Sequence, residues 1–138
     1  MSKNRPRVAP VLGAQDAGQA VQWYCQKLGF RCPSGVYRGM DDQPVYAVLK
    51  RDEIDIHIQI RGRQPQPDSR QSIETDAYLY ISEAKTLFNH CKAQGINIIR
   101  PLQASHYGLI DFMIEDPAGN RLVFGSEPGP YNITRPAI

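Results

Sequence analysis

Apolar residues along this chain recur with two different periods, one typical of helices and one typical of strands. After Asp16, a residue type that often caps a helix N-terminus, the apolar side chains follow one helical stripe that ends at Gly29. The segment Ile54–Ile60 instead alternates strictly, with isoleucines on one face and polar side chains on the other. The pattern predicts an amphipathic helix and a strand that buries one face and leaves a polar face free.

The second half of the chain repeats this design. A predicted strand at Asp76–Ile81 precedes a predicted helix that Ser82 caps and Gly95 ends, just as Gly29 ends the first helix. The two glycines are separated by roughly half of the 138 residues. Self-similarity at this period indicates two copies of one small unit, each of which buries its apolar face by pairing.

Three predicted strands follow each helix, so each half reads as strand, helix and three strands. One helix covers only one face of such a sheet, and the polar and aromatic faces left uncovered are expected to curve around a shared cleft. The predicted fold class is therefore α+β, with two pseudo-symmetric βαβββ modules that form curved sheets and carry their helices outside. The later strands are predicted at Val36–Arg38, Tyr46–Arg51, Ile54–Ile60, Ile96–Ile99 continuing to Leu102, Leu109–Glu115 and Arg121–Gly125.

The first strand is predicted at Val8–Leu12 and contains Pro10. Proline donates no ladder hydrogen bond, so this strand is expected to lie at a sheet edge or to change partners at Pro10. The segment Arg61–Ser72, with two prolines and several glutamines, is expected to connect the halves. The predicted organisation is a flexible N-terminus over 1–7, a first module over 8–60, a linker over 61–75, a second module over 76–127 and a C-terminal tail over 128–138.

Composition places the chain among ordinary globular proteins and excludes some partners. With 41% hydrophobic and 22% charged residues, a chain of 138 residues is large enough for one domain with its own core. A formal net charge of +2 is too small to indicate a nucleic acid or a membrane surface as a partner. Three cysteines without CxxC spacing predict neither a disulfide framework nor a thiolate metal site. The sequence shows no signal peptide and no apolar span, and we expect a cytoplasmic protein.

Polar and aromatic side chains gather on the faces predicted to line the cleft. Histidine can serve as a ligand or general base because imidazole ordinarily titrates near physiological pH, and His57 lies on the polar face of its strand. The alternative is a polar residue that lines a cavity and is hydrogen-bonded to Asp55 or Gln59. Tyrosines supply flat surface with a polar tip, which suits a planar or aromatic ligand, although they also fill cores. The tyrosines expected to face the cleft are Tyr46, Tyr78, Tyr80 and, in a predicted loop over it, Tyr107.

Several sequence motifs resemble the vicinal oxygen chelate superfamily. Trp23-Tyr24 stands before Leu28-Gly29-Phe30, and a Tyr-Gly-x-x-Asp-Phe segment over 107–112 leads into the turn Asp116-Pro117-Ala118-Gly119-Asn120 and an apolar strand. The resemblance runs from about Val8 to Glu127, and it is nearest to the bleomycin-resistance-like branch. The superfamily also includes glyoxalase I, fosfomycin-resistance enzymes and extradiol dioxygenases. It implies paired βαβββ modules, in agreement with the pattern above.

Metal-dependent members of that superfamily place ligands on the first and last strands of each module. Counting back from the helix caps puts Ala9 and Asp76 at the two first-strand positions. Aligning the isoleucines of Ile54–Ile60 with the apolar residues after the Gly-Asn turn puts Asp55 and Val123 at the two last-strand positions. Ala9 and Val123 carry no donor atom, whereas a catalytic divalent ion usually takes three protein ligands and keeps an open position.

The resemblance implies a metal-free binding protein rather than an enzyme. Bleomycin-resistance proteins are dimers that sequester a drug in crevices between subunits and exchange their first strand at a proline, which Pro10 matches. We therefore expect a homodimer that holds a small, partly aromatic compound, without a cofactor, in the manner of an antibiotic-resistance protein. The expected ligand-binding residues are Tyr46, Asp55, His57, Tyr78, Tyr80, Tyr107 and Asp111.

Two alternatives remain open at the level of sequence. One is a metal-dependent lyase or dioxygenase of the glyoxalase type, with a divalent ion held by His57, Asp55 and Asp76. The other is a regulator or immunity-type partner protein in which the cleft no longer binds a ligand. Because many unrelated activities share this scaffold, the resemblance constrains the fold better than the chemistry.

Overall fold

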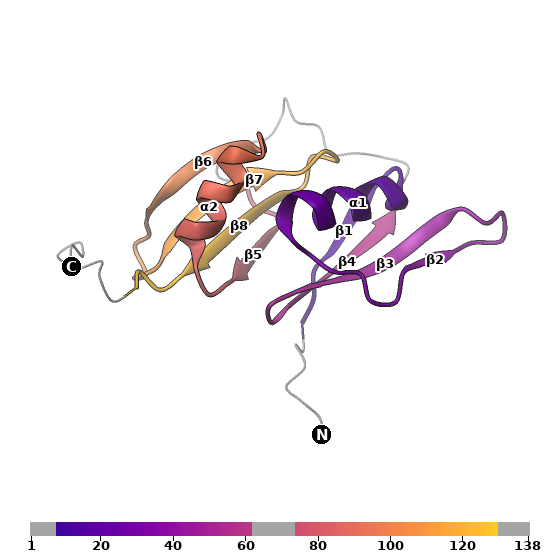
Figure 1. Cartoon of the computed structure of the whole chain (residues 1–138), viewed down its shortest axis with the longest axis horizontal. Coiled ribbons are helices and arrows are strands. Elements are labelled where there is room, and N and C mark those ends of the chain that lie inside the picture. The colour runs from indigo at the N-terminus through magenta and orange to yellow at the C-terminus, as the bar shows by residue number, and fades with distance from the viewer. Residues whose placement is uncertain (1–7, 62–73, 130–138) are drawn as a thin grey trace, which may run out of the picture. The chain divides into compact units, whose positions relative to one another are not determined.

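The computed structural model describes residues 8–61 and 74–129 of the chain. These residues form two compact units, one comprising 8–61 with 117–120 and the other comprising 74–116 with 121–129. Each unit contains one helix and one four-stranded mixed sheet (Figure 1). The α+β class and the two βαβββ modules are thereby confirmed.

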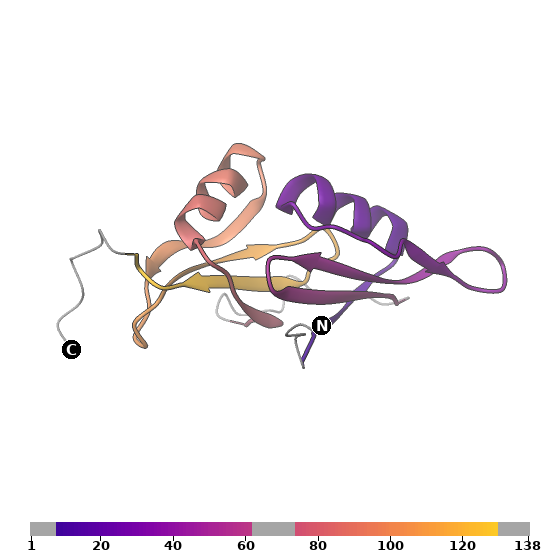
Figure 2. The same cartoon turned by 60° about the horizontal axis from the view of Figure 1, so that its bottom comes forward.

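The first unit is built from β1 to β4 and α1. In its sheet the strand order is β1-β4-β3-β2, with β1 parallel to β4 and the other pairs antiparallel. The sheet packs one face against α1, as the turned view in Figure 2 shows. The elements are β1 (Val11–Ala14), α1 (Ala17–Leu28), β2 (Val36–Arg38), β3 (Pro44–Arg51) and β4 (Ile54–Ile60).

Local sequence explains the bounds of α1. The Asp16 carboxylate accepts a hydrogen bond from the Gln19 backbone N–H at 2.9 Å, which caps the N-terminus as predicted. Gly29 adopts a left-handed conformation with φ of 76°, where a side chain would be strained, and this ends the helix. The stripe residues Tyr24 and Leu28 are buried against the sheet.

The first strand differs from its predicted bounds. It begins at Val11 rather than Val8, so Pro10 lies just before the strand. The carbonyl of Pro10 accepts a hydrogen bond from the His57 N–H. β1 lies at the edge of its sheet and pairs with β4 of the same chain, so the expected edge position is confirmed. Strand exchange at Pro10 between two chains stays a prediction.

The second unit repeats the topology. Its strand order is β5-β8-β7-β6, again with the first strand parallel to the last and the other pairs antiparallel. The Phe88 ring of α2 packs on the Phe112 ring of β7 with centroids 5.2 Å apart, which places the core between helix and sheet. The elements are β5 (Ala77–Tyr80), α2 (Ala84–Ala93), β6 (Asn97–Ala104), β7 (Ile110–Glu115) and β8 (Arg121–Ser126).

The N-terminus of α2 is capped differently from the sequence prediction. The cap residue is Glu83, not Ser82, and its side chain makes no capping hydrogen bond. Instead the Ser126 hydroxyl at the end of β8 accepts a hydrogen bond from the buried Ala84 N–H at 2.8 Å. A distant residue thus satisfies the helix end, and no local pattern reveals it. Gly95, with φ of 71°, follows the last turn as predicted.

Neither of the two helices in the described part of the chain has the length and apolar character that crossing a membrane requires.

Candidate functional site

The candidate ligand-binding residues fall into two groups, one in each unit. Tyr46, Asp55 and His57 lie on β3 and β4 of the first unit, on the sheet face that alternates with the buried isoleucines. Tyr78, Tyr80, Tyr107 and Asp111 lie in the second unit, on β5, on β7 and in the loop between β6 and β7. The second group forms the larger connected arrangement.

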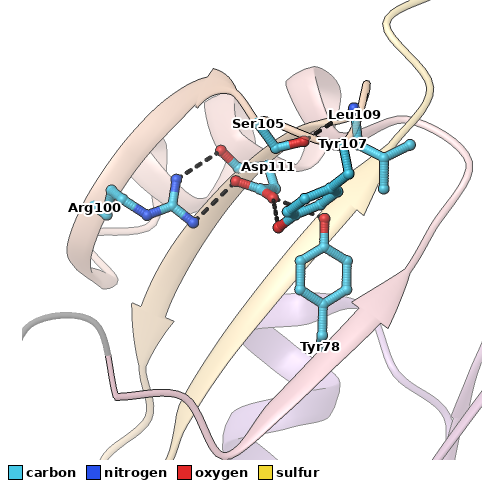
Figure 3. Close-up of polar contacts among 6 residues, drawn as sticks. All are labelled: Tyr78, Arg100, Ser105, Tyr107, Leu109 and Asp111. Carbon is cyan, nitrogen blue, oxygen red and sulfur yellow. Dashed lines mark hydrogen bonds and ion pairs between the residues drawn. The ribbon is translucent and has the colours of Figure 1, made fainter.

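A buried carboxylate organises the second group. Asp111 is only 2% exposed, and its Oδ1 lies 2.9 Å from Nη2 of Arg100 on β6. Arg100 Nη1 also donates to the Asp111 main-chain carbonyl at 3.3 Å (Figure 3). The guanidinium therefore compensates the charge of Asp111, as a buried carboxylate requires. We call Tyr78, Arg100, Tyr107 and Asp111 the Asp111 cluster.

Two tyrosine hydroxyls complete the Asp111 cluster. Tyr78 and Tyr107 both donate to Asp111 Oδ2, at 2.7 and 3.0 Å (Figure 3). Burial raises the pKa of the Tyr78 hydroxyl well above its ordinary value, and the hydrogen bond to Asp111 raises this pKa further. Tyr78 therefore keeps its proton at every physiological pH and acts as a fixed hydrogen-bond donor to the carboxylate.

Gly125 makes the contact between Tyr78 and Asp111 possible. Tyr78 is on β5 and Asp111 is on β7, with β8 between them. In the β7–β8 ladder Asp111 pairs with Gly125, and a Cβ atom at Gly125 would overlap the Tyr78 hydroxyl and ring. The absence of a side chain on β8 at this position lets the Tyr78 ring cross the intervening strand.

The loop before β7 holds Tyr107 over the cluster. Ser105 and Leu109 close this loop through two hydrogen bonds, from Ser105 N to the Leu109 carbonyl at 2.7 Å and from Leu109 N to the Ser105 hydroxyl at 3.0 Å. Gly108 between them has φ of 86°, a conformation that glycine adopts without strain. The tyrosine is thus presented by a closed turn whose geometry its neighbours define.

The sequence did not predict Arg100 as part of the site, because a register shift in β6 decides which face of the sheet its side chain takes. Ile98 pairs with Ile114, and two residues later regular alternation would place Arg100 on that same face. The ladder shifts between Ile98 and Arg100, and Arg100 pairs with Met113 instead. Its side chain therefore lies on the face of Asp111, two residues from Met113 along β7. An arginine next to Pro101 in a predicted strand was the only available signal.

The aromatic rings around Asp111 form a partly exposed surface. The Tyr78 ring contacts the rings of Tyr80 and Tyr107, with centroids 5.2 and 6.0 Å apart. Tyr80 is 69% exposed and Tyr107 is 64% exposed. Three tyrosines thus share one patch, held by contacts with each other and with Asp111. We call Tyr78, Tyr80 and Tyr107 the tyrosine face.

The residues in the first unit form two separate pairs. The Tyr46 hydroxyl oxygen lies 2.6 Å from His57 Nδ1, and the two rings meet edge to face. Asp55 forms an ion pair with Lys50 at 2.8 Å. The hydrogen bond between Asp55 and His57 that the sequence suggested is replaced by the contact of His57 with Tyr46. The Tyr46–His57 pair can offer a ligand a polar contact, because the structure gives the other ring nitrogen of His57 no partner among residues 8–61 and 74–129.

The strand registers correct one residue equivalence between the modules. Leu12 on β1 and Leu79 on β5 are equivalent, because each lies four positions before the cap residue of its helix. Leu12 lies opposite Ile58, and Leu79 lies opposite Phe124. Ile58 therefore corresponds to Phe124, and His57 corresponds to Val123. The alignment of Asp55 with Val123 was wrong by two residues.

Several of the candidate metal-ligand positions are engaged with other groups or lack a donor atom. Within residues 8–61 and 74–129, no group of three or more His, Cys, Asp or Glu side chains could hold a metal ion. Asp55 is bound by Lys50, and Asp76 accepts a hydrogen bond from the Arg121 N–H at 2.8 Å. Val123, opposite Tyr78 in the ladder, has no donor atom.

Comparison with known proteins identifies the scaffold. The family model of the Glyoxalase/Bleomycin resistance protein/Dioxygenase superfamily matches residues 7–124. TioX from Micromonospora sp. ML1 has a similar structure, with 20% identity, a TM-score of 0.68, and coverage of 88% of this chain and 98% of that chain. No curated protein matches the sequence.

Two further solved structures show the range of proteins that share this fold. The bleomycin-binding protein from the bleomycin-producing Streptomyces verticillus, complexed with copper(II)-bleomycin, is 23% identical, with a TM-score of 0.63 and coverage of 90% of this chain and 97% of that chain. A glyoxalase-related enzyme from Clostridium phytofermentans is 17% identical, with a TM-score of 0.69 and coverage of 92% and 97%. At such identities these structures establish a common fold.

Proposed function

Because the chain belongs to the Glyoxalase/Bleomycin resistance protein/Dioxygenase superfamily, we propose that it is a metal-free binding protein for a small, partly aromatic compound. In this proposal it works as a homodimer that sequesters the compound in a cleft between subunits and does not transform it. If that compound is toxic, sequestration gives resistance to it.

The observation that carries the proposal is the exposed tyrosine face. Tyr80 and Tyr107 present most of their ring surface to solvent, although each is held in place by a ring contact to Tyr78. Pre-positioned aromatic rings bind planar molecules at low entropic cost, because few rotamers are lost on binding. A patch of this kind on a sheet face is typical of a ligand contact surface.

Similar proteins and the donor atoms both support binding without metal chemistry. A protein of similar fold is complexed with copper(II)-bleomycin, a drug, and bears the name of a binding protein. In this chain Val123, at the last-strand position of the second module, has no donor atom, and of the first-module candidates Asp55 is paired with Lys50, which leaves His57 as the counterpart of Val123. The Asp111 carboxylate accepts hydrogen bonds from two tyrosines and pairs with Arg100, so a metal would have to displace all three.

The binding test is a thermal-shift screen of planar aromatic compounds against the purified full chain. A ligand at one hundred times its dissociation constant stabilises the folded state by about 2.7 kcal/mol, which is easily detected as a rise in Tm. Tyr80→Ala should abolish the shift, whereas Tyr37→Ala should leave it unchanged. Tyr37 is a matched control because it is 50% exposed and lies on β2, which belongs to the other unit. A hit that survives Tyr80→Ala contradicts the assigned surface.

The metal-free and dimeric parts of the proposal need separate measurements. Elemental analysis of wild type and His57→Ala should find no stoichiometric divalent metal in either protein. Metal present in wild type and lost in the variant would favour the glyoxalase-type enzyme instead. Light scattering over a range of concentrations should give the mass of a dimer, and a monomer at every concentration would remove the homodimer from the proposal.

A further inference from the structure

The direction of the hydrogen bonds at Asp111 determines what the tyrosine face can offer a ligand. An ionised carboxylate accepts hydrogen bonds and has none to donate, so the hydroxyl protons of Tyr78 and Tyr107 both point at Asp111 Oδ2. Each phenol has a single O–H. The hydroxyl oxygens of Tyr78 and Tyr107 therefore keep only lone pairs for any further partner.

Arg100 does not change this polarity. It binds Oδ1 and the main-chain carbonyl of Asp111, whereas the tyrosines bind Oδ2, and Figure 3 shows Arg100 and the two tyrosines reaching Asp111 from opposite sides. The Tyr80 hydroxyl, on a side chain that is 69% exposed, can rotate to donate or accept and adds no preference of its own. On the tyrosine face, the polar atoms with a fixed role are the hydroxyl oxygens of Tyr78 and Tyr107, and both are acceptors.

The charges of the Asp111 cluster cancel. The carboxylate of Asp111 and the guanidinium of Arg100 form one ion pair at 2.9 Å, and the two tyrosine hydroxyls that donate to Asp111 add no charge. An ion placed on the tyrosine face would lose hydration without gaining a net opposite charge. A neutral ligand does not meet this penalty.

From this geometry we propose that the tyrosine face selects neutral, planar aromatic ligands that carry an N–H or O–H donor, and that the Tyr107 hydroxyl oxygen accepts that donor. Tyr107 is the acceptor because it is 64% exposed, while Tyr78 lies beneath it and is half-buried. The ring of the ligand lies against Tyr80. This inference rests on the proposed function, and it adds the hydrogen-bonding and charge class of the ligand.

The test compares indole with 1-methylindole, which differ in a single N–H donor. Each is titrated into the full ¹⁵N-labelled chain, and the amide resonances of Tyr78, Tyr80 and Tyr107 are followed. Indole should bind roughly threefold to tenfold more tightly, the effect of one hydrogen bond. The additional methyl group increases the hydrophobic area of 1-methylindole, so any bias works against the expected result.

Variants assign the acceptor. Tyr107→Phe keeps the ring and removes the hydroxyl, and it should bring the two affinities close to equality, whereas Tyr37→Phe should preserve the wild-type ratio. Charged analogues provide a second arm: tryptamine and indole-3-acetate should both bind more weakly than indole. A preference for indole that persists in Tyr107→Phe overturns the assignment of Tyr107.

The outcomes separate this inference from the function on which it rests. Equal binding of indole and 1-methylindole at the tyrosine face overturns the donor preference but leaves aromatic binding in place. Tighter binding of either charged analogue overturns the preference for neutral ligands. If neither indole perturbs these resonances, the inference and the proposed binding surface both fail.

Discussion

Gly125 pairs with Asp111 in the β7–β8 ladder, and the Tyr78 ring lies over Gly125 on its way to the Asp111 carboxylate. The glycine and the aspartate are therefore parts of one arrangement, although only Asp111 carries a functional group. A side chain on β8 at this position would separate Tyr78 from Asp111.

Gly125→Ala should destabilise the protein by about 1–3 kcal/mol, because the added methyl group overpacks against the Tyr78 ring. In a Tyr78→Ala background the same substitution should cost almost nothing, since the clash is gone. Urea denaturation of the four proteins measures both effects. The matched control is Gly18→Ala in α1, where the new Cβ meets neighbours at 3.4 and 3.7 Å and should be neutral or stabilising. An equal cost in both backgrounds would show that Tyr78 is not the obstacle.

Asp111→Asn should cost about 3 kcal/mol of folding free energy, because it leaves the Arg100 charge without its partner in a partly buried place. Replacing Arg100 with Met in the same chain should recover part of that loss. Asp52→Asn is the control: its ion pair with Arg51 is exposed, and removing it should change stability by less than about 0.5 kcal/mol. Similar losses at Asp52 and Asp111 would indicate that burial of the Asp111 pair has no special role.

The raised pKa of Tyr78 predicts how stability depends on pH. The phenol ionises in the unfolded chain near pH 10 but stays protonated in the folded protein, so above that pH the unfolded state binds fewer protons. The contribution of the protonated Tyr78 hydroxyl to the unfolding free energy is present in full below about pH 10 and is lost as the pH rises further. The difference in unfolding free energy between wild type and Tyr78→Phe should therefore shrink as the pH rises from about 10 to 12. A difference that is constant over this range contradicts the raised pKa.

Ser126→Ala should destabilise α2 by about 1 kcal/mol, because the buried Ala84 N–H loses its acceptor. Ser82→Ala should be close to neutral, since Ser82 is exposed and lies outside the helix cap. Thermal denaturation of the two variants distinguishes the long-range cap from the local one that the sequence predicted. A larger loss of stability in Ser82→Ala than in Ser126→Ala would show that Ser82 caps the helix after all.

Periodicity and end signals in the sequence were enough to predict the two modules. Asp16 and Gly29 bound α1 as expected, and the alternation of Ile54–Ile60 matches the buried positions of β4. These features depend on residues a few positions apart, whose geometry the helix and the strand each impose. The sequence also predicted Tyr78, Tyr80, Tyr107 and Asp111 to line one cleft, and the structure brings these four side chains together. Their role in ligand binding stays a prediction.

Tertiary structure alone decided how these residues interact. The register shift in β6 turned Arg100 toward Asp111, Gly125 opened the path for Tyr78, and Ser126 reached Ala84 across 42 positions of the chain. Local sequence patterns do not predict such contacts, because each contact joins strands or helices that are distant in sequence. Which oxygen of Asp111 receives which donor, and hence what the tyrosine face can offer a ligand, follows from strand order and register rather than from residue type.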